Sequence, residues 1–380
     1  MAGVLVHEWI AATGGSEKVL DSLARMFPLA DLQCLWTDVP DRFPGRNVHQ
    51  TWLAATPLRR SKLAALPFMP GTWSALPAVK AYDWMLVSSH LFAHHARFTG
   101  PARHAVKLSY IHSPARYIWA PEQDSRGSAP VLKAAASLLK PLDRRRSRES
   151  VALAANSAFI RDRIRRVWDL DAEVIHPPVD VGRIQAVPDW AHRLGGRDAD
   201  LLAALPAEFV LGASRFIGYK DLHRVIEVGA RMQLPVVLAG SGPLGARLRE
   251  DAHRAGVPVH FPGTVSDELL FALYQRCRLF VFPPVEDFGI MPVEAMAAGA
   301  RVLANRVGGT AETVVDGATG ALTDFTRPDE LEEAISRANS GSAEAARLRA
   351  ASYSEEIFQS RILAWTARYA GISADSGGAT

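Results

Sequence analysis

Short apolar runs, many of them rich in β-branched residues, alternate along the chain with longer segments of helical period. In the N-terminal half these runs occupy 3–8, 83–89, 105–112, 151–157 and 173–178. A second series occupies 208–214, 235–240, 257–263, 278–284 and 300–305. Buried parallel strands have this near-continuous apolar pattern, and helices between them indicate βαβ units. We therefore expect an α/β protein with two doubly wound, Rossmann-like domains.

A stretch rich in Asp, Pro and Gly at about 179–206 separates the two series. We expect an N-terminal domain over 1–185 and a second domain over 186–355. The last apolar-periodic stretch predicts a helix at about 356–372 that packs back on the first domain. Ligands of doubly wound folds bind at the carboxyl ends of the strands, so a cleft with one domain facing the other is the expected site.

Composition narrows the class of protein and its compartment. A chain of 380 residues is long enough for about two cores, and 48% hydrophobic with 22% charged residues is ordinary for a globular protein. The net charge of +3 predicts no nucleic-acid partner. Only Cys34 and Cys277 are present, which excludes a disulfide framework and favours a reducing compartment. The sequence shows no signal peptide or membrane-spanning run, so we expect a cytoplasmic protein.

Two carboxylates eight residues apart flank a predicted helix start in "VEDFGIMPVEAMAAGARVLAN" (285–305). Pro292 is suited to the first turn of a helix and Gly299 to its end, which predicts a short buried helix with Glu294 in its first turn. Glu294 either complements the helix dipole or accepts two adjacent hydroxyls, as on a ribose. Glu286 precedes the helix, and its carboxylate is able to hold the hydroxyls of a sugar ring.

Backbone and cationic groups complete this set of candidates. The amides of Phe288, Gly289 and Ile290 are available to the same sugar ring, because Gly289 lets the backbone approach closely. Arg215 and Lys220 lie in a loop that enters a helix, where two cations suit a diphosphate; a solvated basic loop is the alternative. Gly240-Ser241-Gly242 follows a strand and is only half of a dinucleotide fingerprint, so by itself it indicates no more than a tight turn.

In this order the motifs resemble the retaining glycosyltransferases of family 4, which have the GT-B fold. The resemblance covers roughly 205–325 and rests on Arg215, Lys220, the turn that ends in Gly242-Pro243, and the pair of Glu286 and Glu294. The N-terminal half is similar as well, in "HEWIAATGGSEKVL", "YIHSPARYIWAP" and "NSAFIRDRIRRVW…VIHPPVD". These stretches look like the bacterial mannosyltransferase branch that builds O-antigen and other surface polysaccharides.

The resemblance implies a role for each candidate. Arg215 and Lys220 would bind the donor diphosphate, Glu294 the nucleotide ribose, and Glu286 the transferred sugar. The remaining donor-binding positions would be Gly14, Gly15, Gly240, Gly242, Val265, Phe288, Gly289 and Ile290. His112 would reach the donor sugar near the anomeric carbon and would join Arg215, Lys220 and Glu286 in catalysis. Asp287 departs from the Gly, Pro or Ser of many relatives and adds a charge beside the sugar.

Other candidates also have a structural alternative. For Gly14-Gly15 it is a plain turn, and for His112 it is a satisfied histidine at a strand end. Arg116 and Tyr117 are assigned to the acceptor side. His90, His94 and His95 have metal-ligand spacing, but we find no carboxylate that pairs with them. We expect no metal and no cofactor, since the nucleotide sugar is a substrate and cationic side chains neutralise the diphosphate.

A basic amphipathic stretch at 131–150 either lies on an anionic membrane surface or is a solvated helix face. A membrane contact would place the enzyme peripherally on the inner membrane face and would suit a lipid-linked acceptor. The stretch 58–73, with its aromatic residues, is a second candidate for contact with the lipid or glycan acceptor.

The resulting prediction is a retaining, metal-independent hexosyltransferase of polysaccharide biosynthesis. It would transfer mannose from GDP-mannose to a hydroxyl of a glycan or lipid-linked glycan. One alternative is the same fold with another nucleotide sugar and a small-molecule acceptor. Another is a catalytically silent scaffold subunit of a polysaccharide assembly complex, although such a copy has no reason to retain Arg215, Lys220, Glu286 and Glu294 together.

Overall fold

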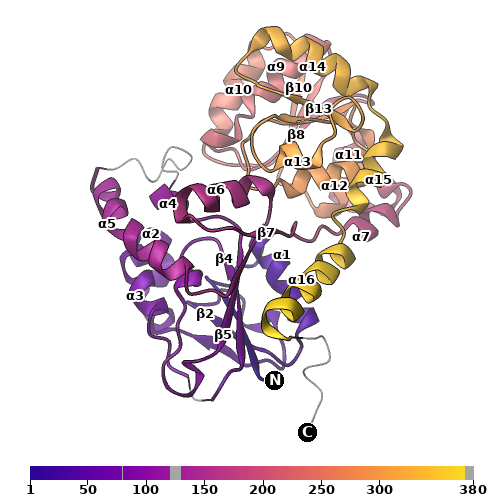
Figure 1. Cartoon of the computed structure of the whole chain (residues 1–380). Helices are drawn as coiled ribbons and strands as arrows, with labels where there is room; N and C mark the ends of the chain where they lie inside the picture. Colours follow the sequence, from indigo (N-terminus) through magenta and orange to yellow (C-terminus); the bar gives the residue numbers. More distant parts are fainter. Residues whose placement is uncertain (79, 120–129, 373–380) are drawn as a thin grey trace. The chain divides into compact units, whose positions relative to one another are not determined.

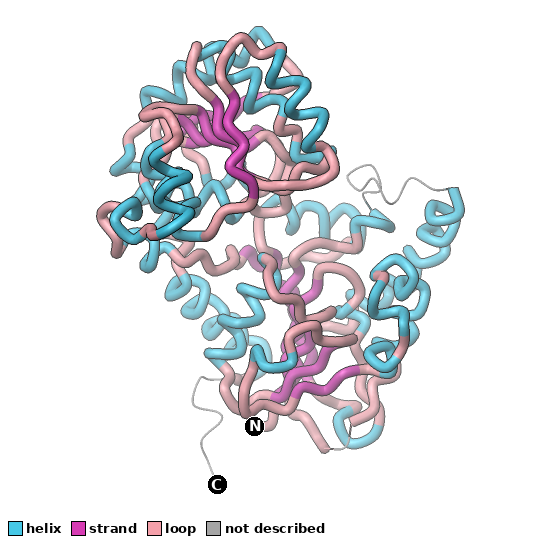
Figure 2. The backbone as a smooth tube through the Cα atoms, turned by 180° about the vertical axis from the view of Figure 1, so that it is seen from behind, coloured by secondary structure: helices cyan, strands magenta, loops and turns pink. Residues whose placement is uncertain are grey.

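The computed structural model describes residues 1–78, 80–119 and 130–372, with the side chains of 130–136 left out. It divides into two compact units. Unit 1 comprises Met1–Pro178 together with the chain from Glu356, and unit 2 comprises Val179–Glu355 (Figure 1). Each unit contains one parallel sheet with helices on its faces (Figure 2). The predicted α/β class with two doubly wound sheets is therefore confirmed.

Unit 1 has a seven-stranded sheet of order β3-β2-β1-β4-β5-β6-β7, in which every pair is parallel. The strands are β1 (Gly3–His7), β2 (Asp31–Cys34), β3 (Val48–Gln50), β4 (Trp84–Ser89), β5 (Val106–Ile111), β6 (Ala152–Ala155) and β7 (Glu173–Val174). The α-helices are α1 (Gly15–Met26), α2 (Lys62–Ala65), α3 (Met69–Trp73), α4 (Arg116–Trp119), α5 (Pro130–Ser147), α6 (Ala158–Trp168) and α16 (Glu355–Ala370). Successive strand side chains alternate between two cores, so Leu5 faces α1 and α16 whereas Val6 faces α3.

Unit 2 has a six-stranded parallel sheet of order β10-β9-β8-β11-β12-β13. Its strands are β8 (Val210–Ala213), β9 (Val236–Ala239), β10 (Val259–Gly263), β11 (Leu279–Phe282), β12 (Val302–Asn305) and β13 (Gly320–Thr323). Its α-helices are α7 (Val181–Gln185), α8 (Gly196–Ala203), α9 (His223–Met232), α10 (Gly245–His253), α11 (Asp267–Arg276), α12 (Ile290–Ala298), α13 (Thr310–Thr313), α14 (Pro328–Ser340) and α15 (Ala343–Ala351).

All ten apolar runs singled out in the sequence contain strands, but three further strands were not expected. β2 reads Asp-Leu-Gln-Cys, so only alternate positions are apolar. β3 is a three-residue edge strand, and β13 begins with a glycine. These short or mixed strands lack the continuous apolar pattern on which the prediction depended.

The boundary between the units lies after Pro178, earlier than the expected position after residue 185. The reason is α7, whose Val181 and Ile184 pack into the core of unit 2. The C-terminal helix α16 packs through Phe358, Ile362 and Trp365 against the unit 1 sheet (Figure 1). No helix in the described part of the chain is both long and apolar enough to cross a bilayer.

Candidate active site

The loops that follow β8, β9 and β10 meet at the carboxyl edge of the unit 2 sheet. Phe216 donates its backbone N–H to the Ser241 carbonyl over 2.8 Å, and Gly240 donates to the Gly263 carbonyl over 2.7 Å. The hydroxyls of Ser241 and Thr264 are 3.0 Å apart. The predicted donor-binding loops are therefore adjacent in the folded unit. Val265 follows them, half-buried against the unit 2 core.

Gly240 and Gly242 are required by this close backbone contact. Gly240 has φ +133°, and a Cβ there would lie 1.8 Å from the Ser214 carbonyl oxygen. Gly242 has φ +154°, and its Cβ would lie 2.7 Å from the Phe216 carbonyl oxygen. Both the positive φ and the contact exclude other residues. The half-fingerprint thus serves the packing of the two loops, and its contact with a donor stays a prediction.

Lys220 and Glu286 form an ion pair between the loops after β8 and β11. Lys220 is 9% exposed, and its ammonium lies 5.0 Å from the Tyr219 ring and 5.9 Å from the Phe282 ring. A buried cation needs a partner, and the carboxylate supplies it here. Arg215 is exposed, and within the described residues no carboxylate forms an ion pair with it. The two predicted phosphate ligands thus lie on one loop. Lys220 is held in an ion pair, whereas Arg215 is open to solvent.

Two glycines after β12, Gly308 and Gly309, contact the loop that carries Glu286, and we call them the glycine pair. Gly309 donates its N–H to the Glu286 carbonyl over 2.8 Å. A Cβ on Gly308 would lie 2.8 Å from that same oxygen, and a Cβ on Gly309 would lie 2.3 Å from the Asp287 carbonyl oxygen. Gly289 has φ +95°, and a Cβ there would lie 2.5 Å from Thr310 Oγ1. The glycine pair is a part of the site that sequence reasoning missed, although "VGG" after a strand was an available signal.

Helix α12 differs from its prediction at the start. It begins at Ile290 and follows the left-handed Gly289, so Glu294 is the fifth residue and lies beyond the first turn. The expectation that Glu294 occupies the first turn was therefore wrong. Pro292 is the third residue of the helix, not the first. Proline is accepted there because the first four N–H groups of a helix have no intrahelical partner. Glu294 is 6% exposed. The predicted end at Gly299 is confirmed by its φ of +93°.

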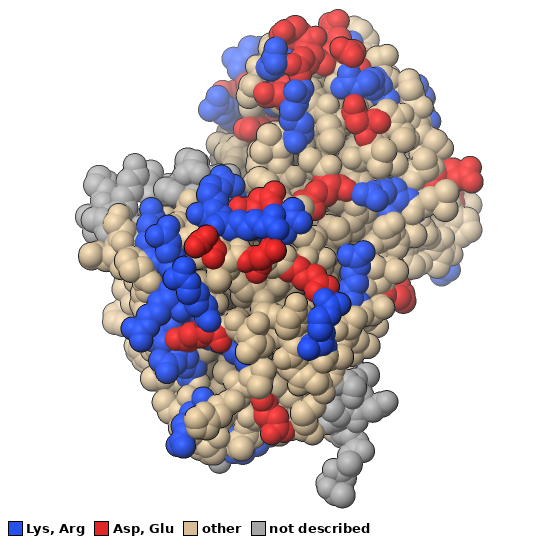
Figure 3. All heavy atoms as spheres, viewed as in Figure 1, with Lys and Arg blue, Asp and Glu red and all other residues tan. Residues whose placement is uncertain are grey.

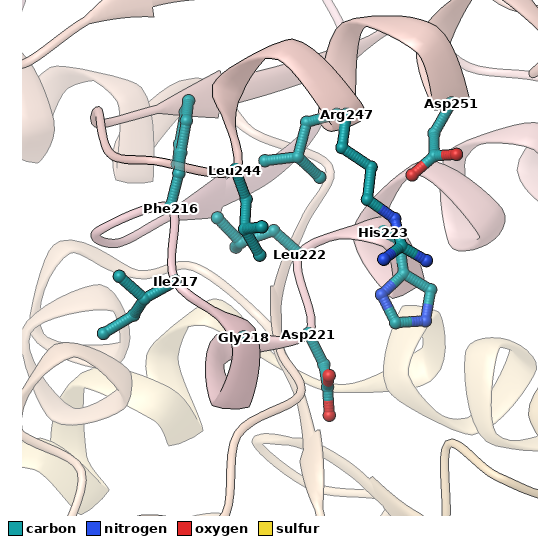
Figure 4. Close-up of a pocket in the computed structure, with 10 residues that line it drawn as sticks. Phe216, Ile217, Gly218, Asp221, Leu222, His223, Leu244, Arg247 and Asp251 are labelled. Carbon is teal, nitrogen blue, oxygen red and sulfur yellow. The ribbon is translucent and has the colours of Figure 1, made fainter. Parts of the chain in front are cut away.

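A pocket of about 180 Å³ lies between helices α9 and α10 and the loop after β8 that carries Arg215 and Lys220. Figure 4 shows Phe216 and Ile217 on one side of it and Arg247 beside His223 on the other. Leu222 and Leu244 lie between them. The loop of Arg215 and Lys220 therefore borders this pocket as well as the carboxyl edge of the sheet.

In unit 1, Gly14 and Gly15 stand at the start of α1, where the sequence placed them. Gly14 is the N-cap with extended backbone, and a Cβ there would lie 2.0 Å from Glu17 Oε2. Glu17 is buried and accepts a hydrogen bond from Ser16 Oγ over 2.9 Å. Gly14 therefore leaves room for this carboxylate. The proposed contact of Gly14 and Gly15 with the donor stays a prediction.

His112 follows β5 and is linked to a second histidine through a serine. Its Nε2 lies 2.8 Å from Ser88 Oγ, and that oxygen lies 3.1 Å from His7 Nδ1. His7 and Ser88 are fully buried at the ends of β1 and β4, and His112 is 9% exposed. Burial lowers the pKa of His7 to about 4 and that of His112 to about 3, so both rings are neutral at pH 7.

The partners of each nitrogen decide where the protons lie. His7 Nε2 is buried and has no partner within the described residues, and a bare lone pair is cheaper to leave unpaired than an N–H. His7 is therefore protonated on Nδ1 and donates to Ser88, which donates its single O–H to His112 Nε2. The relay of His7, Ser88 and His112 therefore predicts that the proton of His112 lies on Nδ1 and that this nitrogen acts as the donor.

Glu8 lies beside this relay and holds the next loop. Its Oε1 accepts the backbone N–H groups of Leu91 and Ala93 over 2.6 and 2.9 Å. Burial raises the pKa of Glu8 to about 7, although those amide hydrogen bonds oppose the shift. Its Oε2 is buried without a partner among the described residues. The carboxyl is thus near the midpoint of its titration at neutral pH.

Arg116 and Tyr117, the predicted acceptor-side residues, begin the short helix α4, and Tyr117 packs against the α3 side of the sheet. In the segment 131–150, the side chains up to residue 136 lie outside the described residues. Of the remainder, Arg144 and Arg145 are exposed and Leu138 is 81% exposed. Figure 3 shows Lys and Arg gathered where Figure 1 places α5. Membrane contact through this segment stays a prediction.

The view that no carboxylate pairs with His94 and His95 was wrong. Asp143 on α5 lies in the same buried cluster, with its Oδ1 3.1 Å from His94 Nε2 and 2.9 Å from His95 Nε2. Its Oδ2 accepts the indole N–H groups of Trp119 and Trp168 over 2.7 and 2.6 Å. A separation of about fifty residues hid the pairing from the sequence.

The three potential ligand atoms of this cluster lie within 4.8 Å of one another, as a metal site would require. Burial alone would raise the pKa of Asp143, but the charges and hydrogen bonds of His94 and His95 outweigh it and hold the pKa well below its usual value. Because the carboxylate already has four N–H partners, the cluster is explained as a hydrogen-bonded structural centre. The expected absence of a metal stays a prediction.

Comparisons with known proteins agree with the geometry of unit 2. Residues 199–355 match the family model described as "Glycosyl transferases group 1". Across 132 residues the chain is 34% identical to the O-antigen chain mannosyltransferase C of Escherichia coli; this alignment covers 33% of this chain and 36% of that protein. Across 194 residues the chain is 30% identical to a GDP-mannose-dependent alpha-(1-6)-phosphatidylinositol monomannoside mannosyltransferase of Mycolicibacterium smegmatis. That alignment covers 47% of this chain and 50% of that protein. The chain spans half or less of the length of these curated relatives.

The fold is also that of solved glycosyltransferase-type structures. The Anabaena protein Alr3699/HepE, solved with UDP and glucose, superposes with a TM-score of 0.66 at 19% identity and covers 96% of this chain and 99% of its own. The two doubly wound sheets and this likeness show the GT-B fold. More narrowly, the chain carries a glycosyl transferases group 1 domain over residues 199–355.

Proposed function

We propose that the protein is a retaining hexosyltransferase that moves mannose from GDP-mannose to a hydroxyl of a glycan or lipid-linked glycan. The observation that carries the proposal is the pair of Lys220 and Glu286, which two loops bring together at the carboxyl edge of the sheet in the matched domain. Both curated relatives described above are named mannosyltransferases, which supports the choice of sugar.

Donor binding would change the partner of Lys220. The diphosphate would take the Lys220 ammonium and the exposed Arg215 guanidinium, which suit it as a point charge and as a fork. Glu286 would then accept hydroxyls of the transferred sugar, and Glu294 those of the ribose. The leaving charge is stabilised mainly by these cations and by the backbone amides of Phe288 to Ile290.

Retention of configuration would follow if the acceptor attacks on the face from which the diphosphate leaves. The departing phosphate then helps to remove the acceptor proton, and no side chain serves as a covalent nucleophile. His112 is neutral and presents its Nδ1–H as a donor, which suits a hydroxyl of the donor sugar rather than proton abstraction. Gly14 and Gly15 would let the backbone of unit 1 approach the phosphates or the sugar.

The first experiment is a thermal-shift comparison of GDP, UDP, ADP and TDP with the full chain. A ligand that binds only the native state raises the melting temperature, by an amount set by its concentration over Kd. We expect a selective shift with GDP that is lost in Lys220→Ala. Arg254→Ala, which removes an exposed cation at the end of α10, is the charge-matched control and should leave the shift intact.

A selective shift with UDP would overturn GDP-mannose but keep the transferase, a result that the UDP-bound Anabaena neighbour makes worth testing. No shift with any nucleotide would favour a catalytically silent subunit. Turnover of GDP-mannose should fall by orders of magnitude in Lys220→Ala, and wild-type rates in that variant would refute the diphosphate assignment.

A further inference from the structure

A cavity of about 690 Å³ opens in unit 1 where the edge strand β3 pairs with β2. Four of its lining residues, Pro67, Phe68, Gly71 and Thr72, belong to the stretch 58–73 that the sequence offers for contact with the acceptor, and none is among the residues predicted for the donor site. Its volume is within the usual range for a small-ligand site. Gln33 and His49, which are register partners on the two strands, form one wall, and Trp52 and Phe68 form part of another.

The strand wall offers both acceptors and donors. Gln33 is 5% exposed, and its Nε2 donates to the carbonyls of Cys34 and His49 over 3.3 and 3.2 Å. No described residue donates to Gln33 Oε1, which is also not among the fully buried unpaired atoms and so can be reached from the cavity. Gln50 uses its Oε1 to accept from the Thr37 N–H over 2.9 Å, which leaves the Nε2 hydrogens as donors.

Two exposed aromatic rings stand on the other wall in a fixed arrangement. Trp52 is 53% exposed and Phe68 is 46% exposed. The rings meet edge to face, with centroids 6.0 Å apart and an interplanar angle of 87°. Trp52 Nε1 donates to Thr72 Oγ1 over 3.0 Å, so the indole is held although it is exposed. A held, exposed indole offers a flat apolar surface at little cost in side-chain entropy.

We propose that this cavity binds a hexopyranose unit of a glycan, at a place separate from the donor site. A pyranose ring has a face of C–H groups that packs on an indole, and its hydroxyls both donate and accept. Gln33 Oε1 would receive a hydroxyl proton, and Gln50 Nε2 would donate to a hydroxyl oxygen. The inference rests on the proposed function for the source of the glycan, which would be the acceptor chain away from the hydroxyl that reacts.

A hydrocarbon chain, the other occupant that a lipid-linked acceptor could supply, fits the chemistry of the walls less well. It would cover the aromatic wall but would also cover Gln33 Oε1 and the Gln50 amide, and give them no hydrogen bond. Buried polar groups without partners are unfavourable, so an apolar occupant would lose part of what it gains from the rings. The mixed lining therefore favours a sugar.

The test is saturation-transfer-difference NMR of the full chain with octyl α-D-mannopyranoside, kept below its micelle concentration. This probe carries both occupants, a sugar ring and an alkyl chain. We expect saturation on the sugar-ring protons, reduced several-fold in Trp52→Ala and in Gln33→Leu and partly retained in Trp52→Phe. Tyr369→Ala removes an aromatic side chain of similar exposure, 45%, from α16 and should change nothing.

Two results would overturn the proposal. One is saturation that depends on Trp52 but is confined to the octyl protons, which would make the cavity a hydrocarbon site. The other is saturation that Trp52→Ala leaves unchanged, or none at all. Lys220→Ala should abolish the GDP shift without affecting this binding. A wild-type chain that binds the mannoside but shows no shift with any nucleotide would therefore refute the proposed function alone. In turnover assays Trp52→Ala should raise KM for long glycan acceptors about tenfold and leave kcat unchanged.

Discussion

Replacing Asp143 by asparagine tests the energetic weight of the buried cluster in unit 1. The carboxylate is fully buried and binds four N–H groups, two from imidazoles on Oδ1 and two from indoles on Oδ2. Asparagine has the same shape but offers one acceptor oxygen and one NH2 group. Whichever way the amide turns, two of the four donors must face its NH2 group.

The expected loss follows from the number of bonds. A hydrogen bond to a charged group contributes about 1.5–3 kcal/mol, so two lost bonds cost about 3–6 kcal/mol. The neutral amide recovers part of this, because burial of the Asp143 charge is itself unfavourable. A net loss of at least about 2–3 kcal/mol remains, a large share of the roughly 5–15 kcal/mol that stabilises a typical domain.

Hydrogen exchange in increasing urea is the appropriate assay, because a chain with two units need not unfold in one step. Peptides from 138–147 and 158–168 report on the cluster, and peptides from unit 2 serve as an internal reference. Asp162→Asn removes a 56%-exposed carboxylate from α6 and should cost less than about 1 kcal/mol. If Asp143→Asn changed the opening free energy no more than this control, the assigned role of the four hydrogen bonds would be refuted.

Two further predictions concern the carboxyl edge of the unit 1 sheet. Ser88→Ala should remove the partner of His112 Nε2 and with it the preference for the proton on Nδ1; ¹⁵N imidazole spectra of labelled protein measure this tautomer, and unchanged His112 shifts would contradict the relay. Glu8→Gln should flatten the pH dependence of unfolding. The raised pKa of Glu8 means that the folded state holds its proton more tightly, so this stability is present below about pH 4.5 and lost as pH rises through about 7. The loss is about 3 kcal/mol over that window, and parallel unfolding curves for wild type and variant would exclude it.

The sequence correctly indicated those features that depend on a local pattern or on the chemistry of a single residue. The apolar runs located ten of the thirteen strands of the described chain, because parallel strands buried on both faces leave a continuous pattern. Lys220 and Glu286 were picked out separately by their types and surroundings, and the fold brings them together. Gly299 was predicted as a helix end because few residues adopt a left-handed conformation readily.

The sequence was uninformative where a feature depends on contacts between distant segments. Asp143 appeared as one acid within a basic helix, and nothing local shows that two histidines and two tryptophans bind it. Gln33 and Trp52 belong to a mixed strand and a short 3-10 turn, and only the fold gives them a shared cavity. A local sequence pattern depends only on the residues that are close along the chain. It does not show which residues are close in space.

The amino-acid sequence alone therefore determined the α/β class, the two doubly wound units and the residue types of the proposed donor site, because hydrophobic periodicity and turn chemistry are local properties. Tertiary structure alone decided that Lys220 meets Glu286, that Ser88 links His7 to His112, and that Asp143 is fully satisfied. Those three outcomes depend on distances between atoms from different strands and helices. Such distances are fixed only when the loops at one edge of a sheet pack together.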